Sequence, residues 1–195
     1  KYVRRYPCCR TNHGMLDSIL GLMTEHKFDY RDVESLEMVQ LYGSPVMLFG
    51  EPKDEHEARF SCLYTSAAAL VDGEIGTDTF TEEKVNDPTI KANMEKIRIY
   101  VKSRWEERPA DHDAGVPVKI TLKDGRVLEH TTPMDQIYGS QQNPWSTEEI
   151  VEKFRENACM ALPPYKVEQA IETWSSVDEV KDLGPALKTL VADGR

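Results

Sequence analysis

The sequence predicts an α+β fold in which strands and helices are followed by a purely helical tail. Apolar and polar residues alternate in residues 33–41, 97–103 and 116–132, the pattern of half-buried strands. Between these stretches the apolar residues recur at helical spacing, and from about Gly139 onward no further strand pattern appears. We therefore predict an α+β domain of antiparallel strands and helices in residues 1–138 and a helical tail in residues 139–195.

Length and composition are those of a folded protein. The 195 residues, 39% hydrophobic and 30% charged, are enough to bury a core and lie outside the range of disordered chains. A net charge of -10 argues against a nucleic-acid surface, which needs a clustered excess of basic residues. No stretch approaches the roughly 18 to 20 apolar residues that span a bilayer. We therefore expect neither a nucleic-acid partner nor a membrane partner.

The cysteines favour a reducing compartment. None of the four lies in the C-x-x-C spacing of a structural zinc site, and the chain has no N-glycosylation sequon. We expect a cytoplasmic protein, or a mitochondrial one if the source is eukaryotic. The chain begins at Lys1 rather than at a methionine, and we expect it to be part of a longer protein.

The first part of the chain predicts a helix, a strand and a second helix. Asn12 is placed to cap the first helix, and the strand that begins at Val33 ends at a Gly-Ser-Pro turn in residues 43–45. Residues 54–73 begin with acidic side chains and stop at an Asp-Gly pair, which predicts one buried helix. Its core stripe would be Phe60, Leu63, Ala67 and Leu70, with Tyr64 partly buried and its hydroxyl on a polar group.

Short helices and a hairpin complete the predicted α+β domain. Residues 80–97 predict two short helices broken at Asp87-Pro88, and a strand follows with Ile97, Ile99 and Val101 on one face. Residues 116–132 predict a β-hairpin around a Lys-Asp-Gly turn.

The tail predicts three helices. Ser146 and Glu149 form the capping signature of the first, which ends at Pro163-Pro164. A second helix runs from about Tyr165 to Trp174, and a third follows Ser176. These helices would expose an apolar face, which predicts an oligomer or a partner at that surface. The residues of this face are Ile150, Val151, Phe154, Leu162 and Trp174.

The opening loop, RRYPCCRTNHG in residues 4–14, carries most of the groups that could do chemistry. Arg4, Arg5 and Arg10 lie beside a predicted helix N-terminus, and guanidinium groups and free backbone N–H groups both favour a carboxylate or phosphate. The alternative is that these arginines are solvated or pair with nearby acidic residues. His13 is either a proton carrier or substrate ligand, or a histidine that only contacts the helix end.

Two other groups have simple structural explanations. Cys8 and Cys9 suggest a nucleophile or a redox pair, but a bond between neighbouring cysteines is strained, and packing of two free thiols is the alternative. The Asp-His-Asp run at 111–113 suggests a metal, but adjacent residues cannot converge on one ion without further ligands. We expect a solvated loop there and no metal site.

Three motifs resemble one known family. RRYPCCRTNHGMLDSILGL is similar to the Lys-x-aromatic-Pro-Cys-Cys-x-x-x-His segment that opens the second domain of MmgE/PrpD proteins. EARFSCLYTSAAALVDG resembles their Glu-Ala-x-Phe-Ser-x-x-Tyr helix, and GSQQNPWSTEEIVEKF their Gly-x-x-x-Asn-Pro-x-Ser segment. The family includes 2-methylcitrate dehydratase, cis-aconitate decarboxylase and iminodisuccinate epimerase. The motifs occur in the family's order and cover most of the chain.

The resemblance implies a fold, a partner and site residues. This chain would be a lid-like C-terminal domain whose tail packs on a separate all-helical domain or subunit. Arg4 stands where the family usually has a lysine in the substrate pocket, and Cys9 stands where the decarboxylase branch places a histidine. Tyr64 and His13 match the family's tyrosine and histidine. The resemblance thus implies Tyr64 and His13 as catalytic residues and Arg4 and Cys9 as pocket residues. Combining this with the anion site of the opening loop, we predict Arg4, Arg5, Cys9 and Arg10 as substrate-binding residues.

Family chemistry implies a reaction without a metal or organic cofactor. A base removes a proton next to a carboxylate, and cationic or hydrogen-bonding groups hold the developing charge. The chain would therefore be part of a dehydratase-type lyase or an isomerase for a small di- or tricarboxylic acid, and inactive by itself. The alternatives are a non-catalytic carboxylate-binding or interaction module and, third, a thiol redox protein.

Overall fold

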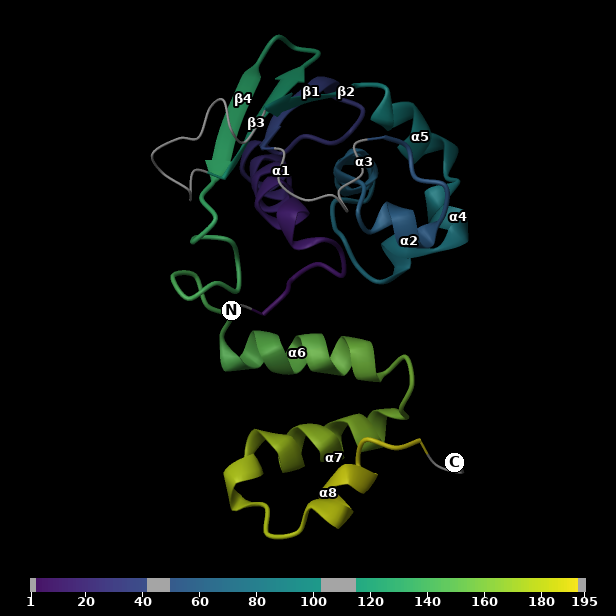
Figure 1. Ribbon diagram of the computed structural model, residues 1–195, viewed down its shortest axis with the longest axis vertical. Coiled ribbons are helices and arrows are strands. Elements are labelled where there is room, and N and C mark those ends of the chain that lie inside the picture. Colours follow the sequence, from purple (N-terminus) through teal and green to yellow (C-terminus); the bar gives the residue numbers. More distant parts are fainter. Residues whose placement is uncertain (1–2, 42–49, 103–114, 193–195) are drawn as a thin grey trace. The chain divides into compact units, whose positions relative to one another are not determined.

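The computed structural model describes residues 3–41, 50–102 and 115–192 (Figure 1). The chain divides into two compact units, Lys1–Pro144 and Trp145–Arg195. Strands and helices occur together in the first unit, and every described element of the second is helical. The predicted α+β class is confirmed, whereas the packing of the tail on a separate helical domain stays a prediction.

The described strands of the first unit form one mixed sheet. They are β1 (Val33–Leu41), β2 (Ile97–Lys102), β3 (Val116–Leu122) and β4 (Val127–Thr132), in the order β2-β1-β3-β4. The antiparallel pairing predicted from the sequence holds for β1 with β3 and for β3 with β4. β1 and β2 are parallel, because the chain returns through several helices before it enters β2.

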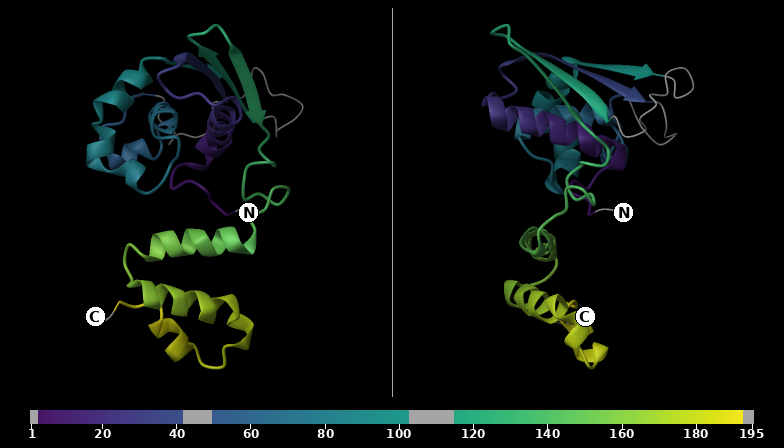
Figure 2. Two further views of the ribbon diagram at one scale, coloured as in Figure 1. Left: turned by 180° about the vertical axis from the view of Figure 1, so that it is seen from behind. Right: turned by 90° about the vertical axis from the view of Figure 1, so that its left-hand side faces the viewer.

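Helices of the first unit cover one face of this sheet. α1 and α3 lie side by side under it, as Figure 1 and the rotated views of Figure 2 show. The core forms between these helices and the inward side chains of the strands, among them Leu36, Ile120 and Leu122, which are fully buried. The helical elements are η1 (Arg10–Asn12), α1 (His13–His26), α2 (Glu55–Ala58), α3 (Cys62–Asp72), η2 (Asp78–Phe80), α4 (Glu82–Val85) and α5 (Pro88–Met94).

Two details of the predicted helices are wrong. Residues 54–73 form α2 and α3 rather than one helix, because the Ser61 side chain accepts the Tyr64 N–H and caps a new helix. Asn12 is the N-cap residue of α1, but its side chain makes no capping bond. Asn12 instead donates from Nδ2 to Thr65 Oγ1 at 3.3 Å, which ties the start of α1 to α3. The other predicted strands and the Asp87-Pro88 break are confirmed.

The second unit contains α6 (Thr147–Ala158), α7 (Pro164–Ser175), η3 (Val177–Glu179) and α8 (Leu183–Lys188). The predicted capping box of Ser146 and Glu149 is present at the start of α6. Arg155 of α6 donates to Glu168 of α7 at 2.7 Å, and Trp174 of α7 donates to Thr189 after α8 at 3.2 Å. Of the predicted apolar face, Ile150 is exposed and the other members are half-buried. None of the described helices is long and apolar enough to cross a membrane.

Candidate functional site

The opening segment is fixed to the first unit by backbone and side-chain contacts. Val3 N–H donates to Gly139 O at 3.1 Å, and Cys9 N–H donates to Arg59 O at 2.8 Å. Between them the Tyr6 ring is buried, and its hydroxyl donates to Asp17 Oδ1 of α1 at 2.8 Å. The opening loop, residues 4–14, is therefore an ordered segment that packs against α1 and against the turn between α2 and α3.

Arg4 and Arg5 have different surroundings. The Arg5 guanidinium lies 3.9 Å from Asp17 Oδ1 and 4.9 Å from the centre of the Tyr138 ring. Arg5 therefore forms an ion pair with Asp17 and contacts Tyr138. Arg4 is exposed and forms no ion pair with a described residue, while its charge acts on the Cys8 thiol. Arg10 is exposed in η1. The structure thus separates the three arginines that the sequence grouped together.

Asp17 is a neighbour of the opening segment that the sequence analysis missed. Its carboxylate also accepts the Tyr138 N–H at 3.0 Å, so it joins the opening segment, α1 and the chain after β4. Burial raises the pKa of Asp17, although the Tyr6 hydroxyl and the Arg5 charge oppose that rise. A charged residue beside the apolar stripe of α1 was the available signal, but its partners are distant in sequence.

His13 lies in the interior of the first unit. It is the first residue of α1 and is fully buried, with its ring centre 5.2 Å from that of Tyr6 in an edge-to-face arrangement. This placement puts an imidazole against the same tyrosine that binds Asp17. Its role as a proton carrier stays a prediction.

The thiols near the opening segment differ in accessibility. Cys8 and Cys62 are buried, and burial raises the pKa of both, that of Cys62 to about 12. Because the thiolate is the nucleophile, both groups are poorly reactive at neutral pH, in agreement with a packing role. Cys9 is half-buried, with its Sγ 3.0 Å from Thr11 Oγ1, and is the most accessible of these three thiols. The Asp-His-Asp run at 111–113 lies outside the described residues.

Tyr64 is fully buried, more than the sequence predicts. Its hydroxyl donates to the Thr79 carbonyl at 2.6 Å, and its ring lies 6.2 Å from that of Phe80. Burial raises the pKa of Tyr64, and the nearby charges of Asp72 and Asp87 raise it further. The hydroxyl therefore stays protonated and acts as a hydrogen-bond donor at neutral pH.

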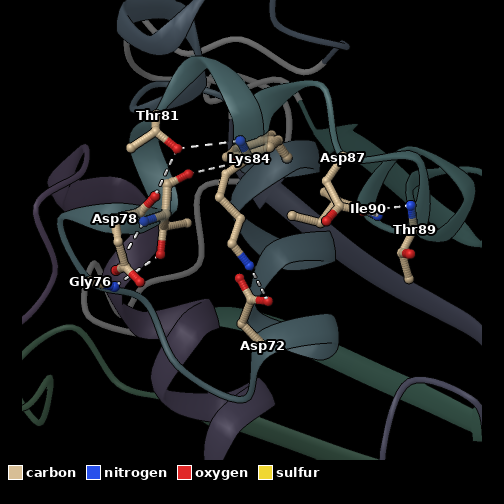
Figure 3. Close-up of polar contacts among 10 residues, drawn as sticks. Asp72, Gly76, Asp78, Thr81, Lys84, Asp87, Thr89 and Ile90 are labelled. Atoms are coloured by element: carbon tan, nitrogen blue, oxygen red, sulfur yellow. Dashed lines mark hydrogen bonds and ion pairs between the residues drawn. The ribbon is translucent and has the colours of Figure 1, made fainter.

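An ion pair holds the segment that carries Thr79. Figure 3 shows Lys84 of α4 extending to Asp72 at the end of α3, with Nζ 2.7 Å from Asp72 Oδ1. Asp87 and Asp78 belong to the same cluster, and both add to the field at Lys84. Because Thr79 lies between Asp72 and Lys84 in the chain, this pair closes the loop that supplies the acceptor of Tyr64.

Replacing Lys84 by methionine is expected to destabilise the first unit at pH 7 by roughly 1 kcal/mol, the upper end for a partly exposed ion pair. The hydrogen bond to Asp72 raises the pKa of Lys84. The pair therefore stabilises the fold below the unfolded value of about 10.5, and this stability is lost as the pH rises through the folded value. Urea unfolding at pH 7 and pH 11 measures it, with Lys91→Met, a more exposed pair, as control. Equal midpoints at pH 7, or a difference that grows with pH, would contradict the prediction.

Arg59 is the second residue that the sequence analysis missed. Its Nη1 donates to Pro7 O at 3.0 Å, and its guanidinium lies 4.7 Å from the centre of the Phe80 ring. The charges of Arg59 and Arg4 both act on the buried Cys8 thiol, and the Phe80 ring that Arg59 contacts also lies 6.2 Å from the Tyr64 ring. The signal in the sequence was that Arg59 is the one arginine or lysine in residues 54–83.

A groove on the other face of the sheet is separate from these residues. It is lined by side chains that include Glu37, Tyr100 and Lys119, of which Lys119 lies 3.9 Å from Glu37. None of the predicted site residues lines it. The substrate-binding and proton-transfer roles predicted for the opening segment therefore do not belong to this groove.

Comparisons with known proteins match most of the chain. The family model described as the MmgE/PrpD C-terminal domain covers residues 6–179, so Arg4 and Arg5 lie just before it. Cis-aconitate decarboxylase of Mus musculus is 32% identical over 136 residues, which are 67% of this chain and 26% of that protein. The Homo sapiens enzyme of the same name is 29% identical over 188 residues, 92% of this chain and 37% of that protein. The mitochondrial 2-methylcitrate dehydratase of Yarrowia lipolytica (strain CLIB 122 / E 150) is 29% identical over 142 residues, 68% of this chain and 27% of that protein.

Proposed function

This chain belongs to the MmgE/PrpD family, and we propose that it is the C-terminal part of a cofactor-independent lyase or isomerase that acts on a small di- or tricarboxylic acid. Relatives are named for the decarboxylation of cis-aconitate and the dehydration of 2-methylcitrate. The observation that carries the proposal is an exposed Arg4 on a segment held by backbone contacts, with the Arg59 guanidinium bound to Pro7 O of the same segment and both charges acting on Cys8. Guanidinium groups without carboxylate partners of their own suit a carboxylate substrate.

The site residues divide into two roles. Arg4, with Arg5, Cys9 and Arg10, binds and orients the substrate, and His13 and Tyr64 serve the proton transfers. Tyr64, whose raised pKa keeps it protonated, serves as a donor and not as a base, a role that requires its hydroxyl to leave the Thr79 carbonyl when substrate binds. A base removes a proton from the carbon next to a substrate carboxylate, and the arginine charge stabilises the enediolate that develops.

The remainder of the machinery lies on a partner domain. The chain spans between about a quarter and somewhat over a third of the length of the relatives it matches. We propose a helical MmgE/PrpD domain or subunit as its partner, and a homo- or hetero-oligomer as the assembly. The tail offers exposed apolar side chains for this contact, among them Tyr165, Leu183 and Leu187. We place the protein in the cytoplasm, or in mitochondria if its source is eukaryotic.

The test is an activity assay with the helical counterpart present, following dehydration and decarboxylation of hydroxy-polycarboxylates and their unsaturated products. Arg4→Gln is expected to lower kcat/KM at least roughly tenfold, because a charge-assisted contact is worth about 1.5–3 kcal/mol. Arg126→Gln, in the exposed turn before β4, is the control. No turnover by the wild type, or turnover that Arg4→Gln and Tyr64→Phe both leave unchanged, would overturn the proposal. Carboxylate affinity without turnover would favour the non-catalytic binding module.

A further inference from the structure

Arg59 is held in one orientation by three contacts. Its Nη1 donates to Pro7 O at 3.0 Å, its guanidinium faces the Phe80 ring at 4.7 Å, and its backbone carbonyl accepts the Cys9 N–H at 2.8 Å. An aromatic ring that contacts the face of a guanidinium fixes the plane of that group, so its N–H donors point in set directions. One of these donors is used by Pro7, and the fork retains others.

Arg59 is half-buried and has no acidic partner in the described part of the chain. Other arginines of this acidic protein do have one: Arg31, Arg126 and Arg155 each lie against an aspartate or a glutamate. Guanidinium groups removed from water favour an anion, because their donors and their charge need compensation.

Arg4 is the second cation whose charge acts on Cys8. Pro7, which binds Arg59, is three residues after Arg4, and both guanidinium groups act on the Cys8 thiol. Arg4 likewise forms no ion pair with a described residue. Arg5, by contrast, is turned toward Asp17. Arg4 and Arg59 are therefore two cations whose charges both reach Cys8, and neither has a carboxylate partner among the described residues.

We propose that Arg59 is a substrate-binding residue that shares a carboxylate of the di- or tricarboxylic acid with Arg4. The proposal rests on the proposed function and adds to it a residue outside the opening motif. Arg4 comes from the exposed loop and adapts, whereas Arg59 is fixed by Pro7 and Phe80 and sets the direction of the carboxylate. With two guanidinium groups, the site would prefer a carboxylate whose oxygens accept hydrogen bonds from both Arg4 and Arg59.

The experiment measures citrate binding to the 195-residue chain by calorimetry, with ¹H–¹⁵N spectra of the same samples. Arg59→Gln is expected to weaken citrate binding roughly tenfold to hundredfold, as for loss of a charge-assisted contact, and Arg4→Gln similarly. Arg59→Lys keeps the charge but loses the fork, and it should weaken binding about threefold. Arg31→Gln, at an exposed arginine paired with Asp29, should leave the affinity within about twofold.

The Cys9 amide separates binding from loop placement, because it donates to the Arg59 carbonyl and reports the position of the segment. Lost citrate affinity with an unmoved Cys9 amide supports direct binding, and a displaced Cys9 amide in Arg59→Gln overturns it. If Arg59→Gln does not fold, Arg59→Lys decides, since unchanged affinity there contradicts the fork. Affinity lost in Arg4→Gln but kept in Arg59→Gln overturns this assignment alone. Absence of citrate binding to the wild-type chain overturns the shared Arg4–Arg59 site, whereas the proposed function is tested separately by turnover with the helical counterpart present.

Discussion

Replacing Gly115 by alanine is expected to destabilise the first unit by about 3–5 kcal/mol, combining left-handed backbone strain with overpacking. Gly115 has a φ of +75°, a conformation that side chains with a Cβ rarely adopt. A Cβ at this position would lie 2.1 Å from Thr132 O and 2.8 Å from Thr132 C. These are backbone atoms of β4, and Thr132 N–H is also bound by Ser18 Oγ of α1 at 3.1 Å. Relief of the clash requires the start of β3 to separate from the end of β4 at the Val116–Thr132 pair, or Thr132 to move away from Ser18 of α1.

Gly125→Ala is the matched control for this prediction. Gly125 has a φ of +88°, but nothing lies within 4 Å of its added Cβ. Its substitution should cost only the backbone term of about 1–2 kcal/mol. Urea unfolding followed by circular dichroism measures both variants. Equal destabilisation by the two substitutions would show that the contact with Thr132 has no energetic weight.

The second large effect is expected at Asp17. Asp17→Ala leaves the buried Tyr6 hydroxyl and the Tyr138 N–H without their acceptor. At about 1–3 kcal/mol for each unsatisfied group, the total is roughly 3 kcal/mol. The variant also releases the opening segment from α1, so the affinity for a carboxylate at Arg4 should fall with the stability.

The cost of Asp17→Ala should depend on pH in an unusual direction. Burial raises the pKa of Asp17 in the folded protein, so the folded state binds the proton more tightly than the unfolded state. Its contribution to stability is therefore fully present below the unfolded value of about 3.9 and decreases as the pH rises through the folded value. Thermal unfolding at pH 4 and pH 7 should show the larger loss at pH 4. Tyr6→Phe removes one donor without exposing a charge, and it should cost less at both pH values. A larger loss at pH 7 would contradict this account.

The strands were predictable because their signal is local. The alternation of residues 116–122 places Val118, Ile120 and Leu122 inward, and the structure buries all three. The parallel pairing of β1 with β2 was not predictable, because it depends on the path of the helices between them. The interruption of the helix at Ser61 was missed because apolar residues continue on both sides of it. The new helix begins there because the Ser61 side chain accepts the Tyr64 N–H, a capping contact that the apolar pattern does not reveal.

The candidate site was predictable only in part. Its sequence motif contains Arg4, Cys9 and His13, and the resemblance of that motif led to the family. Arg59 and Asp17 could not be placed from the sequence, because their contacts join residues 52 and 121 positions apart. Such contacts follow from the packing of the opening segment on α1 and on the α2–α3 corner, for which no local pattern exists.

The hydrogen bond from Val3 N–H to Gly139 O gives the first unit a property that none of its individual elements has. The two ends of the segment 3–139 are therefore adjacent in space. Units with adjacent ends tolerate circular permutation and can be carried as an insert by a second protein with little disturbance to the host backbone. Arg4 follows Val3 directly, so in a protein that carried this segment as an insert, Arg4 would lie next to the point where the insert joins its host.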